Sequence, residues 1–536
     1  MFQQQLDPVF GSLLISALVA AIPIVLLFVL LGVFHVKAPF AAIAALVLSI
    51  VLAIVGWQMP PVQALSATAA GMFYGLFPIL WILVNALWVY KLTVATPWSE
   101  AFGRTIRSIS NDLRILSILI AFCFGALLES LAGFGAPVAI SAAMLMAAGL
   151  KPFKAAIVSL LANTAPVAFG ALAAPIFALA GVTGLPLHDL ASMAGRQTPF
   201  MALLVPLILV FLVDGKRGIK QTWPVALVAG IVFGGVQFLT ANFFAVELTD
   251  VFAAIATIIA VLAMLRFWKP AEIIGATGAD EEEKVVRPGA REIAMSVAPY
   301  VVIITIFSIA QIPAIKAWLG EIGTVTFRWP GLDVVDAAGD PISAQDMHFD
   351  HIKATGTLLL LSGVITALLY RIGFRQGAGI YGETLKQLRW TIVTVTTVLG
   401  LSFVMNLSGQ TATLGMALAS AGVFFVVLSP VIGWLGVAIT GSDTASNSLF
   451  GQLQVTAAEA TGLSPVLMAA TNSSAGVLGK MLSLQNLAVA SAAVGLPGSE
   501  NQLFRKLLPW SLGLLALITV LVVLQATVLS WMVPGN

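Results

Sequence analysis

Charged residues are scarce in this sequence. Lysine, arginine, aspartate and glutamate together make up 9% of its 536 residues, against roughly a quarter in an ordinary soluble domain. The formal net charge is only +2 and is spread over the expected loops, which argues against a nucleic-acid partner. Hydrophobic residues make up 59%. Such a chain cannot hide its apolar surface from water by folding alone, so an ordinary soluble domain is excluded.

Cysteine and histidine are scarce as well. The single cysteine, Cys123, excludes a disulfide within the chain, and its apolar surroundings indicate ordinary packing. The four histidines lie at or near expected loops without the spacing of metal ligands, so no metal site is expected. The sequence also shows no phosphate-binding loop, Ser/His/Asp set or haem-ligand pattern. We therefore expect no cofactor, and we do not expect an enzyme.

Long charge-free stretches recur from one end of the sequence to the other. A membrane core about 30 Å thick needs roughly 20 apolar residues per helix, and the longest stretches suffice for two helices each. We predict an all-α polytopic membrane protein with about 12 to 14 transmembrane helices, some of them broken or re-entrant. The stretches without Asp, Glu, Lys or Arg are 8–34, 38–90, 155–187, 221–246, 293–315, 354–370, 390–442 and 507–536.

Polar segments divide the chain and indicate its orientation. Residues 270–293 are clearly polar and turn-rich, so we expect a cytoplasmic linker between an N-terminal transmembrane half, 1–269, and a C-terminal half, 294–536. The acidic loop 313–353 is predicted to be periplasmic, because basic residues are retained on the cytoplasmic side. The amino terminus is then also predicted to lie on the periplasmic side. The basic loops, predicted to be cytoplasmic, are 91–114, 216–220, 266–291 and 371–389.

The two halves share a sparse internal similarity. Sliding the chain by 313 residues places AAGLKPFKAA (147–156) over ATGLSPVLMA (460–469). Each window follows an acidic residue and a Gly/Ser-rich break, and precedes a second broken helix. Matching interruptions in two halves are typical of transporter binding sites. We predict two repeat-like halves, and the direction in which the second half faces stays open.

Three charged residues, Glu129, Asp443 and Lys480, lie well inside apolar stretches. A charge at membrane depth costs from about 2.5 to above 10 kcal/mol, so such a residue is expected to be functional and to have a partner nearby. The alternative is a structural ion pair, such as Lys480 with Asp443, that fixes helix packing. We favour a function in transport.

Four polar, helix-breaking motifs surround these charges. They combine glycine or proline with carboxylate, carboxamide, hydroxyl or lysine side chains, which close packing through small residues does not require. The freed backbone groups need protein or water partners, so we expect the breaks to line a cavity near the membrane midplane. The motifs are ESLAGFGAPVAI (129–140), NTAPVAFGALAAPI (163–176), TGSDTASNSLFGQLQ (440–454) and TNSSAGVLGKMLSLQN (471–486).

A small anion inside the membrane needs a cation or helix amino-terminal dipoles to replace its lost water. Lys480 is the natural partner for a substrate carboxylate. Desolvation favours the neutral form of Glu129, so we expect Glu129 to couple transport to protons, with Asp443 as its partner or alternate carrier. The residues expected to bind the substrate are Lys480, Asn163, Thr164, Ser446, Asn447, Asn472, Ser473, Gly133 and Gly135.

At these motifs the chain resembles the lactate permease family, which includes L-lactate and glycolate permeases. The likeness covers essentially the full length and includes GMFYGLFPILWILVNALWVY (71–90), NTAPVAFGA (163–171), GRQTPF (195–200) and GWLGVAITGSDTASN (433–447). The resemblance implies proton-coupled uptake of L-lactate, D-lactate, glycolate and related 2-hydroxy monocarboxylates through a bacterial inner membrane.

Three functions other than proton symport are considered. Sodium-coupled carboxylate symport is the main alternative, because hydroxyls and freed carbonyls at helix breaks also coordinate a hard cation. An anion channel fits two isolated carboxylates and one lysine poorly. A membrane enzyme or scaffold has little support. The expected partners are the monocarboxylate, protons and membrane lipid, with the oligomeric state, a homo-oligomer included, left open.

Overall fold

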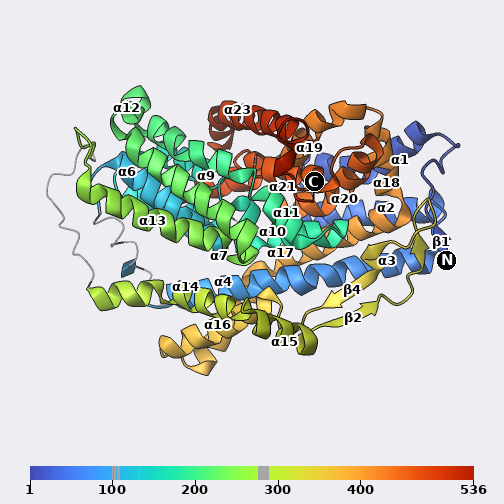
Figure 1. Cartoon of the computed structure of the whole chain (residues 1–536), viewed down its shortest axis with the longest axis horizontal. Helices are drawn as coiled ribbons and strands as arrows, with labels where there is room; N and C mark the ends of the chain where they lie inside the picture. The colour runs from blue at the N-terminus through green and yellow to red at the C-terminus, as the bar shows by residue number, and fades with distance from the viewer. Residues whose placement is uncertain are drawn as a thin grey trace.

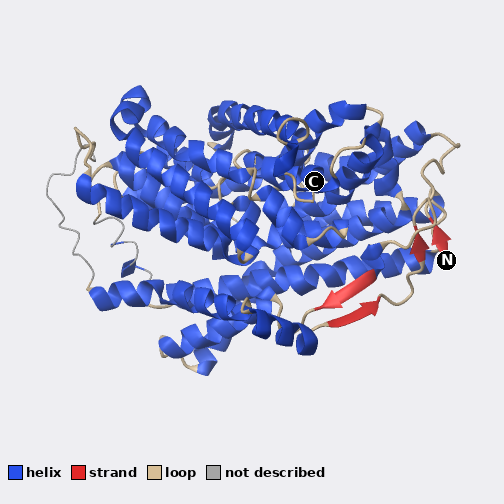
Figure 2. Ribbon diagram, in the orientation of Figure 1, coloured by secondary structure: helices blue, strands red, loops and turns tan. Residues whose placement is uncertain are grey.

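The computed structural model describes residues 1–535 except 99, 102–103, 105–108, 132, 134 and 276–288. Helices form nearly all of the body, and the strands gather at one end (Figures 1 and 2). The first elements are β1 (Phe2–Gln3), α1 (Leu13–Gly32), α2 (Ala38–Val55), α3 (Pro61–Tyr74), α4 (Trp81–Val94), α6 (Leu113–Ser117), α7 (Gly125–Leu131), α8 (Ala136–Ala147), α9 (Pro152–Ala162), α10 (Gly170–Thr183), α11 (Leu187–Ala194), α12 (Thr198–Phe243) and α13 (Thr249–Phe267). The later elements are α14 (Ala290–Ala310), α15 (Pro313–Gly323), β2 (Val325–Arg328), β3 (Val334–Val335), β4 (Asp346–Phe349), α16 (Thr355–Leu369), α17 (Phe374–Ser408), α18 (Gln410–Ala419), α19 (Phe425–Thr440), α20 (Asp443–Thr461), α21 (Pro465–Lys480), α22 (Leu484–Ala493) and α23 (Glu500–Gln525).

The predicted helical membrane fold is confirmed. Within the described residues, ten helices are long and apolar enough to cross a membrane, or eleven when the bent pair Pro152–Ala162 and Val167–Thr183 counts as one span. Proline helps to start several helices because its missing N–H has no partner in the first turn. Prolines in this position are Pro39, Pro61, Pro152 and Pro465.

Helix α12 folds back on itself at Gly215. This glycine has φ +64° and ψ −148°, a conformation that other residues rarely adopt, in the middle of a 46-residue element. Beyond the bend, Gly230 lies too close to the backbone of Leu203 for a side chain, and Gly234 lies tightly against Pro199. The two arms are therefore antiparallel and supply two crossings. Counting the two arms separately gives eleven or twelve spans in the described residues, so only the higher count reaches the lower end of the predicted range.

The helices break at the predicted motifs. Gly133 and Gly135 lie between α7 and α8, and Gly441 lies between α19 and α20. All three glycines have a positive φ. Helices α9 and α10 meet at an angle of 63°. At the start of α10, residues 171–173 are three consecutive non-glycine residues with φ of 44°, 49° and 63°. A left-handed conformation costs such residues roughly 1–2 kcal/mol each, so the surrounding packing must hold this turn in place.

Broken helices of one half pack against those of the other. Helices α8 and α9 contact α22, whereas α20 and α21 contact α10. The windows aligned in the sequence also share local structure, since Gly149 and Gly462 have positive φ and Pro152 and Pro465 follow in the next helix. The likeness is local, so the repeat and the domain boundaries stay predictions. Residues 276–288 of the predicted linker lie outside the described part of the chain.

The amino terminus lies beside the loop 313–353. Strand β1 pairs in parallel with β3, with Phe2 opposite Val334, and β2 pairs antiparallel with β4. The loop thus carries helix α15 and three strands, where the sequence predicted only a loop. Gln345 fixes it by accepting from the N–H of Val334 and donating to the carbonyl of the same residue. Both segments share one face, and the assignment of that face to the periplasm stays a prediction.

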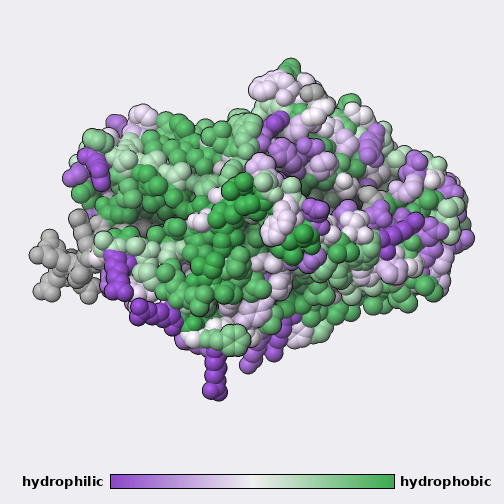
Figure 3. Space-filling view, turned by 60° about the horizontal axis from the view of Figure 1, so that its bottom comes forward, coloured by the Kyte–Doolittle hydropathy of each residue, from purple (hydrophilic) through white to green (hydrophobic). Residues whose placement is uncertain are grey.

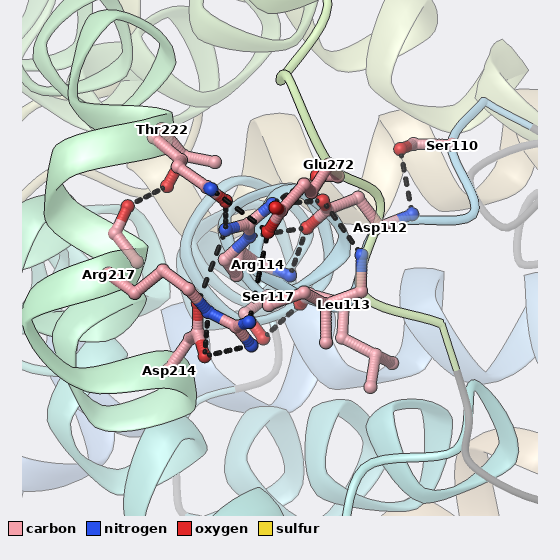
Figure 4. Close-up of polar contacts among 12 residues, drawn as sticks. Ser110, Asp112, Leu113, Arg114, Ser117, Asp214, Arg217, Thr222 and Glu272 are labelled. Atoms are coloured by element: carbon pink, nitrogen blue, oxygen red, sulfur yellow. Dashed lines mark hydrogen bonds and ion pairs between the residues drawn. The ribbon is translucent and has the colours of Figure 1, made fainter.

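At the opposite end of the molecule, three basic loops meet around Arg114 (Figures 1 and 4). Its guanidinium is fully buried and donates to both carboxylate oxygens of Asp112, from Nε at 3.0 Å and from Nη2 at 2.6 Å. Nη1 donates to Asp214 and Gln221. Nη2 also donates to the backbone carbonyl of Glu272. Arg114 therefore ties the start of α6 to the α12 turn and to the polar tract after α13.

Apolar side chains cover much of the outer surface, with hydrophilic residues gathered toward its edges (Figure 3). Large hydrophobic residues stay exposed on the outer helices, among them Leu18 on α1 and Leu368 on α16. An apolar surface this extensive marks contact with lipid rather than water.

Candidate functional site

The three charges predicted at membrane depth meet at one cavity. Glu129 on α7, Asp443 at the start of α20 and Lys480 at the end of α21 all line it, together with Gly133. The cavity has a volume of about 40 Å³. This is room for roughly three water molecules, a size that suits a small solute. We call it the central cavity.

Lys480 pairs with Glu129 across this cavity. Lys480 Nζ lies 2.6 Å from Oε1 of Glu129, and both side chains are less than a tenth exposed. Asn163 donates from Nδ2 to the other carboxylate oxygen, Oε2, at 2.9 Å. A Cβ on Gly170 would lie 3.0 Å from Oε1, so a glycine lets the carboxylate approach the backbone here. The alternative considered above, an ion pair of Lys480 with Asp443, named the wrong partner, because Lys480 pairs with Glu129.

Asp443 has one engaged and one free carboxylate oxygen. Its Oδ2 accepts from Ser473 Oγ at 2.5 Å and from Asn447 Nδ2 at 3.4 Å. Its Oδ1 is buried and has no hydrogen-bond partner within the described residues. A Cβ on Gly476 would lie only 2.7 Å from this oxygen, so the glycine keeps the space beside it open. One oxygen therefore remains for a proton or a ligand.

A second layer of polar side chains holds the Asp443 cluster. Asn472 donates from Nδ2 to Asn447 Oδ1 at 2.9 Å and to Ser446 Oγ at 3.4 Å, and accepts from Gln454. Asn447 also donates to the carbonyl of Pro175 at 3.0 Å, at the start of the regular part of α10. None of these four polar side chains lines the central cavity. Their hydrogen bonds orient one another and Asp443.

Two predicted binding residues lie elsewhere. Thr164 donates from its hydroxyl to the backbone carbonyl of Leu161 within the α9–α10 break. Gly135 lies against Val489 and Asn486 of α22. Neither Thr164 nor Gly135 lines the central cavity. The roles assigned to all the predicted site residues stay predictions, because proximity alone does not test them.

The amino end of α20 supplies two cavity residues that the sequence analysis passed over. Ser442 and Thr444 flank Asp443 and line the central cavity with it. Ser442 caps the helix by accepting from the N–H of Ala445 at 3.3 Å. A helix amino terminus carries partial positive charge, which favours an anion. The motif TGSDTASN already contained this signal, since a Ser next to an acidic residue at a glycine break is typical of a helix start.

A larger cavity of about 610 Å³ lies beside the loop 313–353. Helix α10 connects the two spaces, because Ala174 lines the central cavity and Phe177 lines the larger one. Tyr74 donates its hydroxyl to the backbone carbonyl of Phe177 at 3.0 Å and packs against the ring of Phe403. These aromatic residues line the larger cavity next to the central one. We call the larger cavity the vestibule.

Comparison with known proteins identifies the family. The sequence profile described as L-lactate permease matches residues 16–529. The L-lactate permease of Bacillus subtilis (strain 168) is 40% identical over 99% of each chain. The glycolate permease GlcA of Escherichia coli (strain K12) is 41% identical over 97% of this chain and 98% of its own. The L-lactate permease of the same strain is 38% identical over the full length of both.

Solved structures give a weaker likeness. The YdaH transporter of Alcanivorax borkumensis aligns with a TM-score of 0.45 and 15% identity over 85% of this chain and 86% of its own. The Neisseria gonorrhoeae protein MtrF aligns with a TM-score of 0.44 and 13% identity over 90% of this chain and 95% of its own.

The full-length relatives are named permeases, and the apolar helices make this a multi-pass protein of the inner membrane. The resemblance found in the sequence is thus confirmed, and the chain belongs to the L-lactate permease family, a family of transporters rather than enzymes.

Proposed function

We propose that this chain carries L-lactate and related 2-hydroxy monocarboxylates, including D-lactate and glycolate, into the cell together with protons. The observation that carries the proposal is the buried ion pair of Lys480 and Glu129 at the central cavity. Its substrate class is supported by relatives named for L-lactate and for glycolate. The bacterial inner membrane is the barrier that the substrate crosses.

The ion pair couples the two cargoes through competition for Lys480. While Glu129 is ionised, its carboxylate holds the Lys480 ammonium, and a substrate carboxylate would add an uncompensated negative charge to a buried site. A proton on Glu129 removes that charge and frees Lys480. The substrate carboxylate then takes the vacated position, and the total charge of the cavity equals that before binding. Proton and anion therefore bind together or not at all.

The remaining polar groups suit a 2-hydroxyl. The amino end of α20 presents Ser442 and Thr444 to the central cavity, beside the free Oδ1 of Asp443. A hydroxyl group both donates and accepts, so it can donate to the carboxylate and accept from a neighbouring hydroxyl. The small volume of the cavity favours short monocarboxylates over longer dicarboxylates.

Sodium coupling, the alternative kept open by the sequence, gains no support from the comparisons. Purified protein in liposomes separates the two driving forces. An inward pH gradient is expected to concentrate labelled L-lactate, and a protonophore should abolish that accumulation. Glycolate and D-lactate should compete strongly and succinate weakly. Accumulation driven by a sodium gradient with equal pH on both sides would overturn the proposal.

A further inference from the structure

Asp250, in the first turn of α13, is a buried carboxylate that the site described above does not use. It is fully buried, and its Oδ1 accepts from Gln237 Nε2 at 3.0 Å. Its Oδ2 is also buried and has no hydrogen-bond partner within the described residues. An acidic residue at a helix start often caps its own backbone, but no such bond to Asp250 is present among those described. The free oxygen calls for another explanation.

The polar contacts of Asp250 lead toward Glu129. Gln237 donates from the same Nε2 to the carbonyl of Ala165 at 3.3 Å, in the break between α9 and α10. Asn163, two residues earlier in that break, holds Glu129 by the bond at 2.9 Å. Helix α7 also packs directly against α13. The two buried carboxylates therefore lie on helices that contact each other.

The residues just before Asp250 in the chain line the vestibule. Glu247 precedes it by three residues, lines the vestibule and accepts from Thr355 Oγ1 at 3.2 Å. The vestibule is large enough to hold many water molecules beside Glu247. The other titratable groups on the vestibule wall are Tyr74, His188, Lys316, Asp346, His348, Asp350 and Lys353. Of these, Lys316 lines the same cavity as Glu247, while Glu129 is the charged residue of α7, the helix packed against α13.

We propose that Glu247 and Asp250 form a relay that carries protons from the vestibule to Glu129. The proposal rests on the proton coupling put forward above. A proton passes from vestibule water to the Glu247 carboxylate, then to the free Oδ2 of Asp250, and then to Glu129. Each carboxyl returns to its ionised form when it passes the proton on, so the relay is left unchanged and one proton reaches the central cavity.

Two transport modes of the same liposomes test the relay. Asp250→Asn keeps the size and the bond to Gln237 but cannot pass a proton. We expect proton-driven L-lactate accumulation to fall about tenfold or more, since positioned proton-transfer groups contribute 10² or more to rates. Exchange of labelled for unlabelled L-lactate at equal pH should stay within about twofold of the unmodified protein, because Glu129 keeps its proton during exchange. Asp250→Glu should restore part of the accumulation.

Glu459→Gln, which removes an exposed carboxylate on α20, is the matched control and should change neither mode. Unchanged accumulation in Asp250→Asn would overturn the relay, and so would an equal loss of exchange and accumulation. If that variant cannot be reconstituted, Glu247→Gln decides: it should lower accumulation more than exchange, and no effect overturns the relay. Failure of the unmodified protein to respond to a pH gradient would instead refute proton coupling itself, so the two proposals fail separately.

Discussion

Lys480 Nζ lies 2.6 Å from Glu129 Oε1, although the two residues are 351 positions apart in the chain. The contact joins α7 of the first half to α21 of the second at the central cavity. A buried ammonium beside a buried carboxylate is stable only while both partners remain. This dependence gives the pair its proposed role, because a proton on Glu129 releases Lys480.

Lys480→Met should weaken substrate binding. The variant replaces the ammonium with an apolar side chain of similar length and so removes the cation from the central cavity. Loss of one charge-assisted contact of about 1.5–3 kcal/mol predicts L-lactate binding weaker by about 10- to 100-fold. Equilibrium binding to the purified protein measures this. Lys506→Met, at an exposed position of α23, is the control, and equal weakening in both variants would count against the assignment.

Gly181→Ala should disturb the boundary between the vestibule and the central cavity. A Cβ at this position would lie 2.0 Å from Tyr74 Cζ, so the Tyr74 ring must move and its bond to Phe177 must break. We expect faster labelling of Ala174→Cys, in the central cavity, by a membrane-impermeant maleimide added from the vestibule side. Gly235→Ala adds the same methyl group where no heavy atom lies within 4 Å and should leave labelling unchanged. Equal labelling rates in the two backgrounds would refute a barrier at Tyr74.

Strain in the left-handed turn can be measured by comparing two alanines of α10. Ala171 has φ +44°, whereas Ala178 lies in the regular part of the helix, and both are buried. Replacement by glycine removes the same methyl group at each site. Because a left-handed alanine is disfavoured by roughly 1–2 kcal/mol, Ala171→Gly should cost less stability than Ala178→Gly by about that amount. Thermal unfolding in detergent compares the pair, and the reverse order would show that the turn is unstrained.

The full burial of Arg114 makes a sharper prediction about stability. Arg114→Leu leaves Asp112 and Asp214 without their buried cation and should destabilise the protein by about 3–5 kcal/mol. Arg217 pairs with the same Asp214 but is 56% exposed, so Arg217→Leu should cost less than about 1 kcal/mol. Denaturation in the same detergent tests both. Similar losses in the two variants would mean that burial does not set the strength of this cluster.

The sequence revealed the charged members of the site but not how they pair. Glu129, Asp443 and Lys480 stand out because a charge inside an apolar stretch is visible without any structure. Their pairing depends on how distant helices pack, which composition and spacing do not report. Asp250 escaped notice for a different reason. It follows Glu247 near the expected start of a span, where acidic residues are usually solvated.

The fold shows the same division between local and long-range information. Helix breaks at Gly133, Gly135 and Gly441 were predictable because glycine frees the backbone locally. The reversal of α12 at Gly215 was predictable in a similar way, since the basic loop 216–220 separates two apolar runs. The strands of the loop 313–353 were missed because they are two to four residues long and rely on partners from elsewhere, such as β1.

The central claim is that protonation of Glu129 and binding of the substrate anion at Lys480 are one linked event. The most direct test is the dissociation constant of L-lactate as a function of pH, in the unmodified protein and in Glu129→Gln. With one proton linked to each anion, affinity should fall about tenfold per pH unit once Glu129 ionises in the empty site. In Glu129→Gln, which leaves Lys480 permanently free, the affinity should be high and independent of pH. The same steep pH dependence in both proteins would contradict the account.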